Sequence, residues 1–367
     1  METWPIFSLS LLGIAMIAVL VFAANLSVKR LVGIAAYFNL SSTFMGMTVV
    51  SLATSIPEIT AHVTASVNIL GGRLDMQTGS AIVLGSNIGS DVVQQTFIMG
   101  LVVLLSGTLY FRRYFMWKSM VPMIGSTILC IGLGWDGIYS RLDGAILFGS
   151  FILYSLYLYL DERKFYNAED NVHMSEEISE SIPKTQRQVW IDAGISVLLL
   201  AVTVLAASQV LSITEIIVDR THVSGSLLGV LTLGIASALP ELTTALAGLR
   251  NKEAGISLGT LVGSNITNPL VGIGGGALIS TYAVPIPLIM WDLPWEAVTG
   301  LILWAILWLN KGKLGRKEAI YLMAMYFIFV ILRSYLFPVD FGLKRNQVFF
   351  HLRVERVDFL LNLNRPG

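Results

Sequence analysis

The chain has 367 residues, of which 54% are apolar and only 13% are charged, and its 24 basic and 24 acidic side chains balance. Its mean hydropathy is +0.72. A soluble domain carries about 25% charged residues, so this composition excludes an ordinary soluble protein and predicts a protein that crosses a membrane several times.

Charged residues gather in short clusters between apolar runs of about 20 residues, the length that crosses a bilayer as an α-helix. The first run, residues 6–26, has no basic segment before it and no small-residue cleavage site, so we expect a retained helix and not a signal peptide. The sequence predicts ten spans, at residues 6–26, 31–69, 79–106, 117–137, 143–160, 189–213, 226–249, 255–281, 293–310 and 317–337.

Lys and Arg are distributed unevenly between the two sets of loops. If the N-terminus is outside, the cytoplasmic loops hold 15 basic residues, whereas the outer loops hold only Arg73, Arg141 and Arg220. Because basic loops stay in the cytoplasm, this asymmetry predicts an outside N-terminus in the plasma (inner) membrane. The 15 residues are Lys29, Arg30, Arg112, Arg113, Lys118, Arg163, Lys164, Lys184, Arg187, Arg250, Lys252, Lys311, Lys313, Arg316 and Lys317.

The longest polar stretch, residues 161–188, contains few large apolar side chains and is expected to be a cytoplasmic linker. It divides the chain into a first five-helix unit, residues 1–160, and a second, residues 189–337. Residues 338–367 form a tail to which the sequence assigns no function.

Two blocks of sequence occur twice in the same order. The segment from Gly46 to Glu58 aligns without gaps on the segment from Gly229 to Glu241, and each is followed by Gly-Ser-Asn-Ile, at 85–88 and 263–266. Each half is therefore one five-helix unit. Since five is odd, the second unit enters the membrane from the opposite face, and such inverted repeats place substrate at the membrane midplane between them.

Glu58 and Glu241 lie within apolar helices, where an ionised carboxylate costs roughly 2.5–3.5 kcal/mol. No Lys or Arg lies within a dozen residues of Glu58, and Arg250 falls at the end of the other helix. Bound cations or protons are the remaining means of compensation. Each glutamate follows a proline, Pro57 or Pro240, which frees a backbone carbonyl one turn earlier as a further ligand.

Side-chain oxygens recur at helical spacing around these carboxylates, and none of the candidate ligands is a thiolate. Ca²⁺ takes six to eight oxygen ligands, and two carboxylates match one divalent ion in charge. When Ca²⁺ leaves, Na⁺ or H⁺ must replace it, which is antiport. The hydroxyl and amide ligands predicted from the pattern are Thr54, Ser55, Ser86, Ser90, Ser264 and Asn268.

At these residues the chain resembles the sodium/calcium exchanger family of the cation/Ca²⁺ antiporter superfamily, in its prokaryotic type without a large regulatory domain. The family's two repeats carry Gly-Thr-Ser-x-Pro-Glu and, one helix later, Gly-Ser-Asn-x-x-Asn or Asp, and the match covers roughly residues 1–337. The resemblance implies ten helices and a Ca²⁺ site at Glu58 and Glu241 with the backbone at Thr54 and Ser237. It also implies flanking Na⁺ sites at the carbonyls of Ser51 and Gly234, the hydroxyls of Ser55, Ser86 and Ser264, and the amide of Asn268.

Several positions depart from the family pattern and leave a proton-coupled Ca²⁺ antiporter as the alternative. Ala238 lacks a ligand hydroxyl, Ser90 replaces an asparagine, and Lys118 stands where an acid is usual. Asp91, beside Ser90, and His62, one turn beyond Glu58, are able to carry protons. The competing interpretation makes His62 a packing or pore-mouth residue and Asp91 a solvated helix-interior acid. Neither repeat carries the Gly-Asn-x-x-Glu pattern typical of the Ca²⁺/H⁺ branch.

Two other classes of function fit the sequence less well. An intramembrane zinc hydrolase needs His-Glu-x-x-His, and the segment from Glu58 to His62 lacks the second histidine. A cation channel normally takes its symmetry from parallel subunits and not from an inverted repeat. The single Cys130 excludes a disulfide framework or thiolate metal site within one chain. We therefore expect a secondary transporter, not an enzyme, that requires no cofactor or nucleic acid and for which a monomer can suffice.

Overall fold

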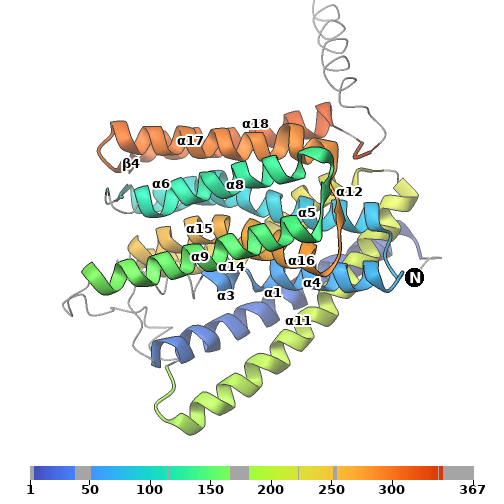
Figure 1. Ribbon diagram of the computed structural model, residues 1–367, viewed down its shortest axis with the longest axis horizontal. Coiled ribbons are helices and arrows are strands. Elements are labelled where there is room, and N and C mark those ends of the chain that lie inside the picture. The colour runs from blue at the N-terminus through green and yellow to red at the C-terminus, as the bar shows by residue number, and fades with distance from the viewer. Residues whose placement is uncertain are drawn as a thin grey trace, which may run out of the picture.

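The computed structural model is a bundle of helices, most of which run along one common direction (Figure 1). It describes residues 4–37, 51–111, 113, 116–165, 182–221, 223–250, 254–337 and 339–341. The helices of the first half are α1 (Ile6–Tyr37), α3 (Ser51–Thr54), α4 (Ile56–Leu70), α5 (Met76–Val93), α6 (Met99–Ser106), α8 (Val121–Leu133) and α9 (Arg141–Phe165). Those of the second are α11 (Gln186–Thr221), α12 (Gly225–Leu228), α13 (Gly234–Ser237), α14 (Leu239–Arg250), α15 (Ala254–Thr267), α16 (Gly274–Ile279), α17 (Leu293–Leu309) and α18 (Arg316–Leu336).

Wider, π-helical turns interrupt or begin five of the long helices in the described part of the chain. Each of these helices continues through the turn as one span. The turns occupy Gln94–Ile98, Met116–Met120, Gly229–Leu233, Asn268–Ile273 and Leu288–Asp292. Such turns are rare in ordinary helices and concentrate at functional sites. Three of the five lie in the helices that carry the predicted ligands or directly follow them.

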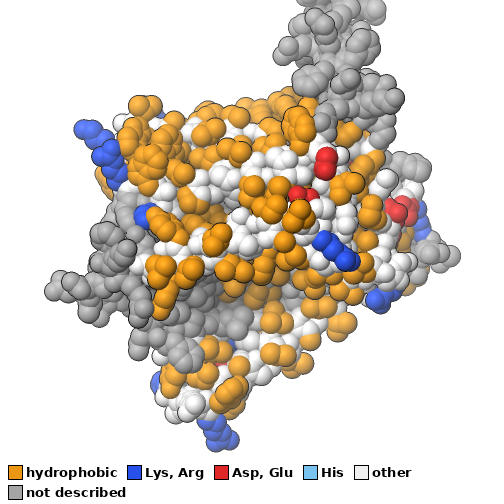
Figure 2. Space-filling model, viewed as in Figure 1, with side chains coloured by type: hydrophobic (Ala, Val, Ile, Leu, Met, Phe, Trp, Pro, Cys, Tyr) orange, Lys and Arg blue, Asp and Glu red, His pale blue; other side chains and the backbone are white. Residues whose placement is uncertain are grey.

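The all-helical, polytopic architecture is confirmed. Among the described residues, eight helical segments are long and apolar enough to cross a membrane. The other two predicted spans correspond to residues 51–70 and 254–279, which are helical but are not among those eight. Figure 2 shows apolar side chains spread over the flanks of the bundle, as a lipid-facing surface requires.

Three predicted boundaries were wrong. The second span does not begin at residue 31, because α1 continues to Tyr37 without a break, and residues 38–50 lie outside the described part. The linker is shorter than residues 161–188, since α9 extends to Phe165 and α11 begins at Gln186. Polar residues at these helix ends extend the helices beyond the apolar runs. Residues 166–181 and 342–367 also lie outside the described residues.

Two small β-ribbons tie the halves together at opposite ends of the bundle. At one end β1 (Thr108–Tyr110) pairs antiparallel with β4 (Lys313–Gly315), and at the other β2 (Ile138–Tyr139) pairs antiparallel with β3 (Tyr282–Ala283). Downstream of the repeated motifs, Met116 aligns with Met290 and Arg141 with Arg316, so β1 corresponds to β3 and β2 to β4. Equivalent strands therefore lie at opposite ends, as inverted five-helix repeats require.

Close contact between α5 and the α12–α13 segment forms the centre of the bundle. A Cβ atom added at Gly229 would lie 2.4 Å from the carbonyl oxygen of Ile82, and one at Gly85 would lie 2.4 Å from that of Ser226. Only glycine permits this backbone approach, which is how small residues draw membrane helices together. The glycines of the repeated motifs thus bring the third and seventh spans into contact.

The α1 and α11 helices pack against each other along one side of the bundle (Figure 1). Leu20, Ala206 and Ala207 form a small hydrophobic cluster between them that is separate from the main core. Arg30 of α1 also forms an ion pair with Asp192 of α11. The pair is therefore a packing unit with its own contacts, set against the central helices.

A buried arginine links the last helix to the start of the seventh span. Arg333 is fully buried and donates to Asp292 at 2.9 Å and to the hydroxyl of Ser226 at 2.5 Å. Asp340, in the segment assigned to the tail, accepts from the hydroxyl of Ser224 at 2.6 Å and from the backbone N–H of Ser226 at 2.9 Å. The tail therefore begins as an ordered contact of the fold.

The central glycine contact can be tested with a matched pair of substitutions. We expect Gly229→Ala to destabilise the protein by about 1–3 kcal/mol, because its methyl group has no space between the third and seventh spans. Gly125→Ala on α8 meets nothing within 4 Å, and should be neutral or slightly stabilising since alanine favours the helix. Thermal unfolding of the two purified variants in the same detergent measures the difference; equal melting temperatures would contradict the packing argument.

Candidate cation site

Two broken helices supply the carboxylates. The first break separates α3 from α4 at Ser55, and the second separates α13 from α14 at Ala238. Pro57 and Pro240 follow two residues later and lack the N–H that would bond back across the break. Glu58 and Glu241 consequently sit in the first turn of the second half-helix in each repeat.

Glu58 and Glu241 are buried at the contact between the two repeats. Glu58 is 2% exposed and Glu241 is 0% exposed, and they lie close enough to interact electrostatically. The hydroxyl of Ser237 lies beside Glu58, and that of Thr54 lies beside Glu241. Thr54 and Ser237 occupy equivalent positions in the repeats, so each repeat places a hydroxyl near the carboxylate of the other.

The third and eighth spans add a second layer of hydroxyl contacts. Ser90 of α5 donates to Glu58 Oε1 at 2.8 Å, and Gln94 Nε2 donates to the Ser90 hydroxyl at 2.9 Å. Ser264 of α15 donates to Glu241 Oε1 at 3.1 Å and lies 3.3 Å from the Thr54 hydroxyl. The structure therefore brings Ser90 and Ser264, one member of each pair spaced by four residues, directly to the carboxylates.

The remaining hydroxyls of the predicted set lie around these contacts. Ser51 Oγ lies 2.8 Å from Thr267 Oγ1, and its carbonyl accepts from Thr54 at 3.2 Å. The carbonyl of Gly234, at the position equivalent to Ser51, accepts from Ser237 at 3.3 Å. Ser55 is fully buried, and its hydroxyl has no hydrogen-bond partner.

A small cavity of about 30 Å³ opens beside Glu58. Glu58, Ser86 and Ser237 form its polar wall, and apolar side chains of α1 and α11, among them Leu20 and Val210, form the opposite wall. A space of this size holds a water molecule or an ion with few ligating waters. Ser86 thus lies next to the carboxylate on the side covered by the α1–α11 pair.

Asn268 and Asp91 form a neighbouring polar contact. Asn268 Nδ2 donates to Asp91 Oδ1 at 2.7 Å, and the amide of Asn265, oriented with its nitrogen toward Asp91, donates to the same oxygen at 3.0 Å. Asp91 is 1% exposed, so it is not an acid solvated by an open vestibule in this conformation. Two amide groups, and not water, donate hydrogen bonds to its carboxylate.

His62 contacts a tyrosine and no carboxylate among the described side chains. Its Nδ1 lies 3.2 Å from the hydroxyl of Tyr282, which also lies 2.6 Å from Ser66 Oγ. Its Nε2 is buried without a partner. In this conformation His62 belongs to the contact between α4 and the loop that carries β3.

The electrostatics of the site favour a cation. Within the described residues neither glutamate has an ion pair, and no group of three or more His, Cys, Asp or Glu side chains is arranged to hold a metal. The Oε2 atoms of Glu58 and Glu241 and the Oδ1 of Asn268 are buried with no hydrogen-bond partner. Two carboxylates and several neutral oxygens, with no thiolate among them, suit a hard cation such as Ca²⁺ or Na⁺.

Further polar residues around this site belong to neither repeated motif. Thr267 contacts Ser51 from the eighth span, and Gln95 donates to Glu296 O at 2.9 Å and to Thr299 at 2.6 Å, which accounts for the polar third helix. Glu296 itself is 2% exposed and accepts from Thr127 at 2.6 Å. An acid inside an apolar span was the signal that would have identified it.

The sequence also matches known proteins. A sequence model of the family described as "Sodium/calcium exchanger protein" matches residues 8–160 and 191–335. The putative antiporter CaxA of Alkalimonas amylolytica is 30% identical over 269 residues, covering 72% of this chain and 78% of that protein.

Solved structures share the fold. The sodium-calcium exchanger NCX_Mj superposes with a TM-score of 0.56 at 22% identity, covering 88% of this chain and 96% of that one. The H⁺/Ca²⁺ exchanger CAX superposes with a TM-score of 0.69 at 15% identity, covering 99% of this chain and 92% of that one. With the family model matched across both repeats, this chain belongs to the sodium/calcium exchanger family of membrane proteins.

Proposed function

We propose that this protein is a secondary antiporter that exchanges Ca²⁺ for Na⁺ at a midplane site shared by Glu58 and Glu241. The observation that carries the proposal is the pair of buried carboxylates, each with one unpartnered oxygen and neither in an ion pair among the described residues. A buried dianion needs external positive charge, since the desolvation cost of each uncompensated ion is several kcal/mol.

Charge balance then couples the two ions. One Ca²⁺ neutralises both carboxylates. Na⁺ and Ca²⁺ therefore compete for the same oxygens, and a site that holds Ca²⁺ cannot also hold its full complement of Na⁺. When Ca²⁺ leaves, the empty site is costly to bury. The protein therefore switches between its outward-open and inward-open conformations only after other cations have entered. This exclusion makes the exchange obligatory without an enzymatic step or a cofactor.

The ligands follow from the contacts around each carboxylate. We assign the Ca²⁺ site to the two glutamates with oxygens of Thr54 and Ser237, which each lie beside the glutamate of the opposite repeat. The flanking Na⁺ ligands that we propose are Ser51, Ser55, Ser86, Ser90, Gly234, Ser264 and Asn268.

The α1–α11 pair is the element best placed to control access. It covers the small cavity beside Glu58 and has its own hydrophobic cluster, so the two helices can shift together as a unit. We propose that this shift alternates access between the two ends of the bundle. The N-terminus then lies outside and the linker lies in the cytoplasm of the plasma (inner) membrane, as the distribution of Lys and Arg favours.

Proton coupling is the second candidate, and specific positions favour it. Ala238 cannot supply the hydroxyl that Ser55 supplies in the other repeat, and Ser90 supplies a hydroxyl where the family pattern has an amide. Fewer neutral oxygens weaken Na⁺ sites, whereas carboxylates can accept protons without further ligands. The fold is shared with an H⁺/Ca²⁺ exchanger as well as with a sodium-calcium exchanger.

The carboxylates can be tested by charge removal. We expect Glu58→Gln or Glu241→Gln to abolish Ca²⁺ uptake into Na⁺-loaded vesicles, because one remaining charge cannot balance Ca²⁺. Asp136→Asn, which removes one acidic charge from an exposed residue after α8, provides the control and should retain uptake. Uptake is measured with radioactive Ca²⁺; wild-type rates in both site variants would exclude the proposed site.

The coupling ion can be tested with the wild-type protein. Vesicles loaded with Na⁺ and diluted into Na⁺-free buffer should take up Ca²⁺ at constant pH. A pH gradient without Na⁺ should drive little uptake. If the pH gradient alone drives uptake equally well, the coupling ion is H⁺ and not Na⁺.

The hydroxyls that contact the carboxylates can be tested singly. We expect Ser90→Ala and Ser264→Ala each to weaken apparent Ca²⁺ affinity about tenfold or more, since a hydrogen bond to a charged group contributes about 1.5–3 kcal/mol. Ser126→Ala is the matched control, because that buried serine bonds only to the carbonyl of Met123 on its own helix. Concentration dependence of the initial uptake rate measures the affinity; an effect of the control as large as that of the site variants would point to general loss of packing.

A further inference from the structure

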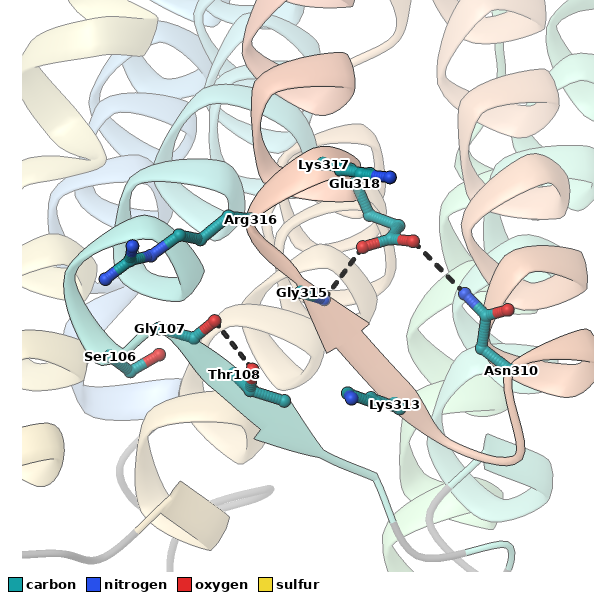
Figure 3. Close-up of a pocket in the computed structure, with 9 residues that line it drawn as sticks. All are labelled: Ser106, Gly107, Thr108, Asn310, Lys313, Gly315, Arg316, Lys317 and Glu318. Atoms are coloured by element: carbon teal, nitrogen blue, oxygen red, sulfur yellow. Dashed lines mark hydrogen bonds between the residues drawn. The ribbon is translucent and has the colours of Figure 1, made fainter.

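A second cavity, far larger than the one beside Glu58, opens at the end of the bundle that carries the β1–β4 ribbon. Its volume is about 790 Å³, within the range of pockets that bind small molecules. Figure 3 shows two segments around it, one from the end of α6 and the other from α17 through β4 to the start of α18. The lining residues that matter for its chemistry are Ser106, Asn310, Lys313, Arg316, Lys317 and Glu318.

The charge of this cavity is positive. Glu318 is the only acid among the lining residues, and its two oxygens are already used, by Gly315 N–H at 2.9 Å and by Asn310 Nδ2 at 3.3 Å (Figure 3). Lys313, Arg316 and Lys317 are exposed, and no ion pair or hydrogen bond joins them to another described side chain. Three free cations therefore surround a concave surface.

The helix that starts here adds to this potential. Arg316 begins α18, a helix of 21 residues, so the positive end of its dipole and its first N–H groups face this end of the bundle. Helix N-termini with nearby cations are favourable places for phosphate groups. The basic side chains and the helix dipole thus favour the same ligand charge.

The fold does not require these lysines. In the internal alignment, Arg316 corresponds to Arg141, so Lys313 and Lys317 correspond to Ile138 and Leu142 of the first repeat. Both of those apolar side chains are exposed at the opposite end, at 45% and 70%. The same local structure therefore forms without the charges, which leaves them available for a ligand.

The cavity also lies where membrane-spanning segments end, which is where lipid headgroups are expected. It is bordered by the last residue of α6, Ser106, and the first of α18, Arg316, which are ends of membrane-spanning segments. Trp304 and Trp308 stack near the same end of α17, and Arg113 lies 4.5 Å from the ring of Trp308. Tryptophan and arginine of this kind mark the membrane interface.

We propose that this cavity binds a phosphate-bearing anion, held by Lys313, Arg316 and Lys317. The ligand is either the headgroup of an anionic phospholipid in the adjacent leaflet or a soluble phosphate ester, and both present the same chemistry to the three cations. Basic pockets between membrane helices bind phospholipid headgroups in this way. This proposal does not rest on the ion that the protein transports.

The test compares two double variants of equal charge change. Lys313→Gln with Arg316→Gln removes two cavity cations, whereas Lys184→Gln with Arg187→Gln removes two exposed cations near the start of α11, at the same end of the bundle. Binding of phosphatidylglycerol is measured by native mass spectrometry after reconstitution in mixed phosphatidylcholine–phosphatidylglycerol nanodiscs. We expect the cavity variant to bind about 30-fold more weakly, and the control to stay close to wild type.

A second arm identifies the source of the phosphate. Glycerol phosphate is added to wild-type protein in pure phosphatidylcholine nanodiscs, and its effect on the melting temperature is compared with that on the cavity variant. Stabilisation of the wild type alone supports a soluble ligand, whereas selective retention of phosphatidylglycerol supports a lipid. The proposal is overturned if neither ligand binds, or if both double variants weaken binding equally. Melting of each variant in phosphatidylcholine alone verifies that both are folded.

Discussion

Two carboxylates buried between apolar helices impose the constraint on which the rest of the structure depends. Neither Glu58 nor Glu241 has a basic partner among the described residues, and both are almost fully removed from solvent. In a low-dielectric interior, two like charges repel each other and lose their hydration. The fold therefore has to supply polar atoms at this point and still leave oxygens free, which the unpartnered Oε2 atoms do. A helix with all its bonds satisfied and a wholly apolar surface could not meet that requirement.

The breaks in the two glutamate helices and the central glycines serve this point. Breaks at Ser55 and Ala238 place each glutamate in the first turn of a half-helix, and the crossed contacts of Thr54 and Ser237 make each repeat depend on the other. Glycines such as Gly229 let the third and seventh spans approach closely, and Ser90 of the third span donates to Glu58. Close backbone packing also replaces the hydrophobic driving force that helices lack within lipid.

The inverted repeat and most of the site could be predicted because both depend on pairs of local signals. A proline before a glutamate in an apolar run can be recognised in a single sequence. Its recurrence at Glu241 indicates the two-fold repeat. Contacts between helices that are distant in the chain could not be predicted from the sequence. Thr267 lies in the eighth span without a motif of its own, and the partner of His62 turned out to be Tyr282, 220 residues away. The ends of α1 and α9 were misplaced because polar residues continue a helix into water, where hydropathy no longer reports it.

Asp340 gives the C-terminal segment a role that its composition does not reveal. Its carboxylate accepts hydrogen bonds from Ser224 and Ser226 at the first turn of the seventh span. Arg333 of α18 donates to the hydroxyl of Ser226 as well. The half of the seventh span that leads to Gly234 and the break before Glu241 is thereby anchored to the end of the chain. A shortened form that stops at the last apolar residue, Phe337, would lose this clamp, whereas one that ends after residue 341 would keep it. The position at which an expression tag is joined to this protein thus decides whether the contacts at the start of the seventh span are kept.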